Sequence, residues 1–187
     1  LALLDNIDEY IDDIELLTSQ VLTFSKLNAV QNTHEKQKLQ CVQLDEYIRS
    51  RVRHLHGDAE LDIVLNLTTA ELKCDPAYLR LMFDNIFKNA LKYAHSQVKV
   101  TLALSNTHPQ SSLIMLTVED DGCGIDKQDF DTVFLPFARV DKSRNQETGG
   151  LGLGLAIAKA ATRRLQGELV LDTETIGYEK IGAIVSN

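Results

Sequence analysis

The chain lacks several features that would place it in common classes of protein. It has no run of about 18 apolar residues and no visible signal peptide, so no part of these 187 residues is expected to span a membrane. It has no excess of basic residues. The net charge is −8, which argues against a nucleic-acid binder, because such a protein needs a basic face for phosphates. Its three cysteines form no CxxC pair, so we expect reduced thiols and neither a disulfide framework nor a zinc site.

What is present is an ordinary globular composition, 44% hydrophobic and 25% charged, without internal repeats or low-complexity tracts. Residues 1–28 carry apolar side chains at spacings of three and four, which predicts one long amphipathic helix that needs a partner helix to cover its apolar stripe. Residues 29–38 are polar and without period, which is typical of a linker. Residues 39–187 are expected to form a separate domain. Because the first residue is Leu1 rather than Met, we expect the chain to be part of a longer protein.

The pattern within residues 39–187 predicts helices and strands in alternation. Asp75 is the expected N-cap of the strongest helix, and Pro76 occupies its first position, where a missing N–H costs nothing. The segment 105–112, with Pro109, is expected to be the turn between two strands. The expected helices are 45–55, 76–93, a short one near 126–133, and 152–165. The expected strands are 39–44, 61–67, 71–74, 97–104, 113–119, 168–173 and 181–186.

Two asparagines of the helix 76–93, Asn85 and Asn89, lie one turn apart at the border of its apolar arc. Asn is a mediocre helix former, so the pair needs a reason. One interpretation is that the side chains cap neighbouring backbone groups. The other is an edge that faces a ligand. In that case Asn89 would offer its carbonyl oxygen to Mg²⁺, a hard cation that shares phosphate oxygens, and Lys92 would meet a phosphate.

An apolar strand ends in Glu119, Asp120 and Asp121, and glycines follow at positions 122 and 124. Carboxylates at the end of a strand are often simply solvated, and a glycine turn can lack a function. Glycines at alternate positions, however, let the backbone approach a ligand closely. An aspartate on the floor of such a pocket can accept a hydrogen bond from an exocyclic amino group, such as that of adenine.

A third stretch has four glycines in the six positions 149–154, directly before a good helix start. Free N–H groups and the helix dipole at such a start attract anions, so this pattern favours a phosphate site. Two other phosphate motifs do not fit. A dinucleotide fingerprint would need glycine where Leu155 stands, and a Walker loop would need lysine at the same position.

Together with Phe134-Leu135-Pro136-Phe137, these three stretches resemble the N, G1, F and G2 boxes of sensor histidine kinases, the GHKL ATPases of bacterial two-component systems. The boxes cover about residues 84–157, and the flanking pattern extends the likeness over nearly the whole chain. The run Phe134–Arg144 is most similar to the RstB and CpxA group of sensors. The resemblance implies an α+β fold, a two-layer sandwich with a mixed sheet packed on helices. The helix 1–28 would be the second helix of a dimerisation hairpin.

The resemblance implies a site for ATP and Mg²⁺. Asn89 would bind the metal and act in catalysis together with Lys92, and Asp120 would read the adenine amino group. Phe134 and Phe137 match anchors of the loop that closes over the nucleotide, although plain core packing is equally open for both. The further positions that the resemblance assigns to the nucleotide are Asn85, Tyr93, Gly122, Gly124, Ile125, Phe137, Arg139, Gly150, Leu151, Gly152, Leu153 and Gly154.

The implied activity is that of an ATP-dependent protein-histidine kinase, which passes the phosphoryl group on to an aspartate of a response regulator receiver domain. The whole protein is expected to be a homodimer through the helical hairpin. It would be anchored in a bacterial inner membrane, with this part in the cytoplasm and no nucleic acid as partner.

The phosphoacceptor of that family, a His-Glu with Pro four residues further on, has no counterpart in this chain. His34-Glu35 comes nearest, but Leu39 stands in place of the proline. We therefore expect the acceptor histidine to lie outside residues 1–187. Two alternatives stay open: a GHKL module that binds nucleotide without transferring phosphate, and another GHKL enzyme such as an Hsp90-, gyrase- or MutL-type ATPase or an anti-sigma kinase.

Overall fold

The computed structural model describes residues 2–29, 38–57, 60–108, 111–138, 151–172 and 179–186. The helices are α1 (Ala2–Asn28), α2 (Leu44–His56), α3 (Pro76–Tyr93) and α4 (Gly154–Arg164), with a short 3₁₀ helix η1 (Lys127–Asp129). The strands are β1 (Gln40–Gln43), β2 (Asp62–Leu67), β3 (Glu71–Cys74), β4 (Gln97–His108), β5 (Ser111–Asp120), β6 (Gly167–Asp172) and β7 (Glu179–Ser186).

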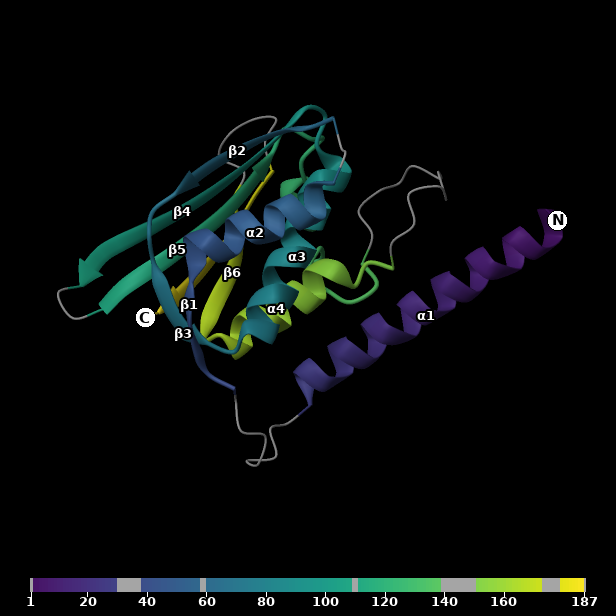
Figure 1. Ribbon diagram of the computed structural model, residues 1–187, viewed down its shortest axis with the longest axis horizontal. Coiled ribbons are helices and arrows are strands. Elements are labelled where there is room, and N and C mark those ends of the chain that lie inside the picture. The colour runs from purple at the N-terminus through teal and green to yellow at the C-terminus, as the bar shows by residue number, and fades with distance from the viewer. Residues whose placement is uncertain are drawn as a thin grey trace.

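The main sheet has five strands in the order β2-β4-β5-β7-β6, and β1 pairs with β3 in a separate two-stranded sheet. The pair β2–β4 is parallel, whereas β4–β5, β5–β7 and β6–β7 are antiparallel. Figure 1 shows the main sheet as one layer, with α2, α3 and α4 along one of its faces as the second layer. The expected two-layer α+β sandwich with a mixed sheet is therefore confirmed.

The helix α3 lies at the centre of the second layer. Its N-cap is Asp75, whose side chain accepts a hydrogen bond from the Ala77 N–H at 2.9 Å, with Pro76 in the first turn, as expected. Two of its aromatic rings, Phe83 and Phe87, are fully buried and stacked with their centroids 5.5 Å apart. One face of α3 thus belongs to the core, and its other faces are left to carry polar groups.

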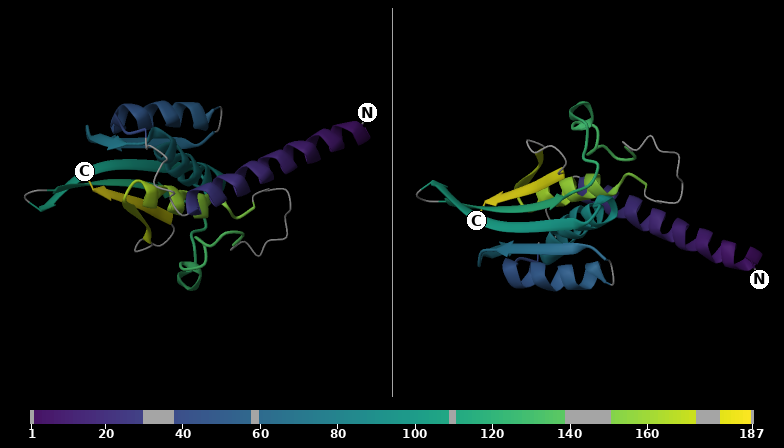
Figure 2. Two further views of the ribbon diagram at one scale, coloured as in Figure 1. Left: turned by 90° about the horizontal axis from the view of Figure 1, so that it is seen from below. Right: turned by 90° about the horizontal axis from the view of Figure 1, so that it is seen from above.

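The helix α1 extends away from both layers as a single rod, and its C-terminal end lies beside α4 (Figures 1 and 2). The long helix predicted from the spacing of apolar residues is confirmed. Much of its apolar stripe is uncovered, since Ile11, Ile14 and Val21 are 49%, 59% and 43% exposed. In the described part of the chain, no helix combines the length and the apolar character that a membrane span requires.

One expected turn is wrong. The segment 105–112 was expected to be a loop because it is polar, but β4 continues to His108 and β5 begins at Ser111, with these two residues paired. An antiparallel ladder needs only main-chain groups, so it extends beyond the apolar part of both strands. A shift of register between Ser105 and His108 marks the change. The short helix expected near 126–133 is shorter than predicted. It is a single 3₁₀ turn, η1, followed by further turns.

Candidate functional site

The three stretches singled out in the sequence meet along α3. Gly122 follows β5 and lies against the C-terminal end of this helix, where a Cβ at residue 122 would overlap the Tyr93 carbonyl oxygen. Gly154 begins α4, and a Cβ there would lie 3.3 Å from Asn85 Oδ1. Any side chain at residue 122 would displace the backbone of Tyr93, so Gly122 allows the close approach of β5 to α3, whereas at residue 154 a Cβ would require only a small shift of the Asn85 side chain.

Asp120, the last residue of β5, is a buried carboxylate with spare acceptor capacity. The residue is only 3% exposed, and within the described part of the chain its side chain has a single hydrogen bond, accepted by Oδ1 from the Gly122 N–H at 3.0 Å. Burial raises the pKa of this carboxyl to about 6, against the opposing effect of the Gly122 hydrogen bond. A buried carboxylate needs partners, so the arrangement suits a ligand that donates a hydrogen bond here.

Asp121, the next residue, has a structural role that the sequence analysis did not foresee. Its carboxylate accepts hydrogen bonds from the backbone N–H groups of His95, Ser96 and Gln97 at 2.9–3.1 Å, and from the Ser96 hydroxyl. These bonds hold its pKa well below the usual range, the Ser96 hydroxyl having the largest effect. The end of β5 is thereby tied to the segment that follows α3. The two adjacent aspartates thus differ in role, because Asp120 faces the interior and Asp121 binds the segment that follows α3.

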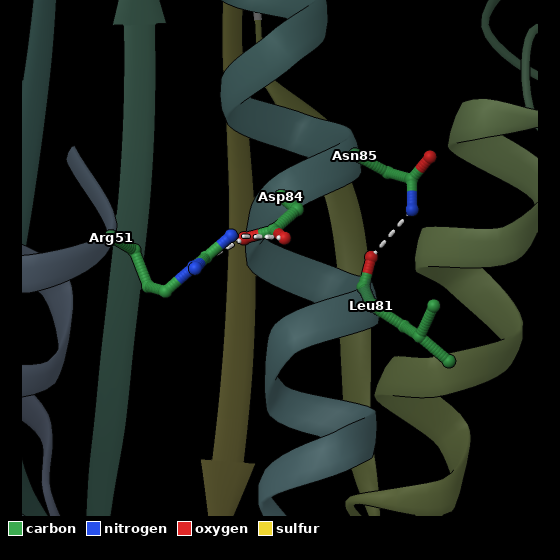
Figure 3. Close-up of polar contacts among 4 residues, drawn as sticks. All are labelled: Arg51, Leu81, Asp84 and Asn85. Atoms are coloured by element: carbon green, nitrogen blue, oxygen red, sulfur yellow. Dashed lines mark hydrogen bonds and ion pairs between the residues drawn. The ribbon is translucent and has the colours of Figure 1, made fainter. Parts of the chain in front are cut away.

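The two asparagines of α3 differ in their bonding. Asn85 donates from Nδ2 to the Leu81 carbonyl one turn earlier at 2.7 Å, as Figure 3 shows, so the capping interpretation holds for this half of the amide. Its Oδ1 is the atom that faces Gly154. Asn89 is half-buried, and among the described residues its side chain has no hydrogen-bond partner. Its carbonyl oxygen is therefore available to a ligand, as the metal-binding interpretation requires.

Another polar contact of α3 fixes the helix on its opposite side. Arg51 of α2 forms a two-pronged ion pair with Asp84, with Nε to Oδ1 at 3.0 Å and Nη2 to Oδ2 at 2.6 Å (Figure 3). This geometry is the strong, directional form of an arginine–carboxylate pair. It orients the turn of α3 that also carries Asn85.

Two residues with positive φ, Phe137 and Gly152, face each other where the two ends of the loop before α4 meet. Gly152 has φ +68°, and a Cβ on it would overlap the Ala138 carbonyl. Phe137 has φ +65°, which is strained for an aromatic residue, and its N–H donates to the Gly152 carbonyl at 3.0 Å. Its side chain is 61% exposed, so core packing does not explain Phe137. Phe134, by contrast, is buried, and the Lys159 ammonium lies 4.6 Å from its ring centroid.

The other positions expected at the nucleotide divide into three groups. Ile125 and Leu151 are half-buried against the core, and Leu153 is wholly inside it. Lys92 is exposed at the end of α3, with its ammonium 5.0 Å from the Tyr93 ring centroid, while Gly124 has φ +70° and open space around it. Arg139 and Gly150 lie outside the described residues. The structure thus places Tyr93, Asp120 and Gly122 together at the end of α3, and Asn85 with Gly154 eight residues earlier on the same helix, whereas Leu153 serves packing.

We expect the buried charge of Asp120 to destabilise the fold at neutral pH. Below about pH 4 the carboxyl is protonated in both states and carries no penalty, but between about pH 4 and 6 the folded chain holds a proton that the unfolded chain has lost, so the free energy of unfolding falls as the pH rises and the full penalty is reached above pH 6. Asp120→Asn removes the charge and keeps an oxygen for the Gly122 N–H. At pH 7.5 it should raise the free energy of unfolding by about 1–2 kcal/mol, or Tm by roughly 3–6 °C.

Thermal unfolding followed by circular dichroism at pH 7.5 and 4.5 checks this expectation. The gain of Asp120→Asn should shrink at pH 4.5, where the wild-type carboxyl is protonated in the folded chain. Equal Tm values at pH 7.5 would show that Asp120 is not penalised by its burial.

Comparison with known proteins agrees with this geometry. The sequence profile described as "Histidine kinase-, DNA gyrase B-, and HSP90-like ATPase" matches residues 74–185, which include α3, Asp120 and α4. The chain belongs to this family of ATPases. Its relatives are sensor kinases. It is 32% identical over 168 residues to the sensor protein RstB of Escherichia coli (strain K12), covering 89% of this chain and 37% of RstB. It is 36% identical over 103 residues to the sensor histidine kinase CpxA of the same strain, covering 55% and 21%.

The fold also has a close counterpart among solved structures. The structure of full-length ShkA in complex with AMPPNP superimposes with a TM-score of 0.78 at 20% identity, over 95% of this chain and 36% of ShkA. At that identity the likeness shows a shared fold. The resemblance to sensor histidine kinases of the RstB and CpxA group is thus confirmed. The chain spans about a third of the length of RstB and about a fifth of CpxA.

Proposed function

We propose that this chain is the ATP-binding catalytic part of a sensor histidine kinase, which transfers the γ-phosphoryl group of ATP to a histidine outside residues 1–187. The observation that carries the proposal is the buried Asp120 carboxylate, which lies beside Gly122 at the end of α3 and has acceptor capacity to spare. An adenine amino group is a donor of the right kind for it. The AMPPNP complex of ShkA, which shares the fold, supports an adenine nucleotide as the ligand.

Each group along α3 then has a place in the reaction. Asp120 accepts a hydrogen bond from the adenine amino group. Gly122 and Gly124 have no side chain, which leaves room for the base. Asn89, whose amide has no partner among the described residues, would hold Mg²⁺ through its oxygen, and Lys92 would orient a phosphate. Bound Mg²⁺ would neutralise charge on the phosphate oxygens. Phosphoryl transfer depends on positioning and on neutralisation of charge, so these residues need not form a covalent intermediate.

The start of α4 supplies the phosphate side of the site. Its first residue is Gly154, and the exposed N–H groups of a first helical turn, together with the helix dipole, favour an anion there. Gly152 lies where the two ends of the preceding loop meet. We assign Gly150, Leu151 and Arg139 of that loop to the triphosphate. Phe137 and Ile125 are assigned to the rim of the pocket. Tyr93 and Asn85 shape its wall, and the buried Leu153 packs behind it.

The partners follow from α1 and from the relatives. The uncovered apolar stripe of α1 suits a helical hairpin that pairs with a second copy, which makes residues 1–28 part of a dimerisation domain, 29–38 a linker and 39–187 the catalytic domain. The phosphoryl group would pass from the histidine to a response regulator receiver domain. The natural protein would be an inner-membrane sensor with this part in the cytoplasm.

The role of Asn89 tests the proposal. Asn89→Ala should weaken ATP binding roughly tenfold or more when Mg²⁺ is present, and change it little in EDTA, because only the metal-dependent part of the affinity is lost. Isothermal titration calorimetry with and without Mg²⁺ measures both. Asn66→Ala is the matched control, since Asn66 is exposed on β2. An equal loss with and without metal would remove Asn89 from the metal site.

A further inference from the structure

The C-terminal end of α1 is clasped by a single side chain from α4. Arg164, the last residue of α4, donates from Nε to the Leu27 carbonyl at 2.9 Å, and from Nη2 to the carbonyls of Leu27 at 2.6 Å and Ala29 at 3.0 Å. The last carbonyls of a helix have no partner within it, and they form the negative end of its dipole. A guanidinium is suited to them, because its donors are directional and always charged.

The same end of α1 is embedded in the catalytic domain. Leu27 is 7% exposed and belongs to the hydrophobic core, and Phe24 packs against that core one turn earlier. Towards the other end, Ile14 and Tyr10 are 59% and 67% exposed. Burial and the clasp thus coincide on the last turn and a half of α1, and the rest of the helix projects freely (Figures 1 and 2).

The helix α4 connects this clasp with the candidate nucleotide site. Its first residue, Gly154, faces Asn85, and Lys159 in its middle lies over the Phe134 ring. Arg164 is at its last turn, about 15 Å from the start for ten residues of helix. The single helix α4 therefore contacts the candidate nucleotide site at its start, Phe134 in its middle and α1 at its end.

We propose that Arg164 is a positioning residue that fixes the angle at which α1 meets the nucleotide site, so that α1 and the catalytic domain move as one body at this joint. The inference rests on the proposed function in so far as α1 is the neighbour of the helix that carries the acceptor histidine. The hydrogen bonds of Arg164 go to main-chain carbonyls. They therefore hold the end of α1 itself and do not depend on the side chains of that helix.

The orientation is tested directly in this chain, without reference to catalysis. Spin labels at Ser19→Cys on α1 and Glu168→Cys on β6, both at exposed positions, report one distance across the joint when the exposed Cys41 and Cys123 are replaced by serine. We expect a narrow distance distribution that broadens at least twofold in Arg164→Ala. Arg164→Lys keeps the charge without the fork and should be intermediate.

Arg163→Ala is the matched control. Arg163 is exposed in the same turn of α4, and in the described part of the chain its side chain bonds to no carbonyl of α1. The control should leave the distribution narrow. The proposal is overturned if Arg164→Ala stays as narrow as the unsubstituted chain, or if Arg163→Ala broadens it equally, because the effect would then be one of general charge.

A kinetic measurement separates positioning from mere stability. In a longer chain that carries the acceptor histidine, Arg164→Ala should lower kcat of autophosphorylation about tenfold and leave KM for ATP unchanged, since the reacting groups lose their fixed approach. An unchanged or raised kcat would contradict a positioning role. If the unsubstituted longer chain transfers no phosphate, the proposed kinase function fails, while the distance measurement still decides whether Arg164 fixes the joint.

Discussion

Asp120→Ala should abolish measurable binding of ATP while the fold persists. The substitution removes the buried Asp120 carboxylate, and with it the proposed acceptor of a hydrogen bond from the adenine amino group. A hydrogen bond to a charged group contributes about 1.5–3 kcal/mol, and the nucleotide donor would also be left without a partner. We therefore expect the Kd for ATP to rise about a hundredfold or more.

Calorimetric titration of the variant with ATP measures this loss, and two comparisons make it specific. Asp126→Ala is a matched control, because Asp126 is exposed six residues further on and its side chain caps no helix in the described part of the chain. GTP tests the base, since guanine presents a carbonyl where adenine presents its amino group. Unchanged ATP affinity in Asp120→Ala, or equal binding of GTP by the unsubstituted chain, would refute the assignment of Asp120.

The same carboxylate predicts how binding depends on pH. Because burial raises its pKa to about 6, the group that accepts the adenine amino group becomes protonated as the pH falls through that value. ATP affinity should therefore decline below pH 6 more steeply than the titration of the phosphates alone would cause. Asp120→Asn, which has no proton to gain, supplies the background curve.

The sequence was sufficient to predict the elements whose signal is local. The N-cap Asp75, Pro76 and the spacing of Leu79, Phe83 and Ile86 predicted α3 correctly to the residue. The order of the four motifs along the chain, two of them rich in glycine, predicted the family, and the matching profile confirms it. These features could be predicted because capping and helical period are properties of short stretches of chain.

What could not be predicted depends on contacts between distant segments. The alternation of β5 places Asp120 on the same face as the buried Leu116 and Val118. Nothing in the local sequence shows that Asp121 binds the backbone of residues 95–97. The clasp of Arg164 on Leu27 joins residues 137 positions apart. The strand pairing of His108 with Ser111 arises from main-chain groups, which side-chain polarity does not report. The nucleotide and metal roles of the site residues remain predictions, which the titrations above address.

The second large effect concerns phosphorylation. We expect this chain to bind ATP and yet to remain unlabelled by γ-labelled ATP, because none of its five histidines stands in the sequence context of a phosphoacceptor. The nearest, His34, has Leu39 in place of the proline and lies outside the described residues. Of the other histidines, His56 contacts the Leu61 carbonyl through its ring at 3.0 Å, and His95 follows α3.

A longer chain that carries the segment before Leu1 should acquire label that is labile in acid and stable in base, the behaviour of phosphohistidine. Asn89→Ala in that longer chain should reduce the label by at least tenfold if Asn89 holds Mg²⁺ during transfer. His34→Ala in the short chain is the decisive control. If the short chain labels itself and the label disappears in His34→Ala, the acceptor lies within residues 1–187 and the proposed division of labour between the two segments is wrong.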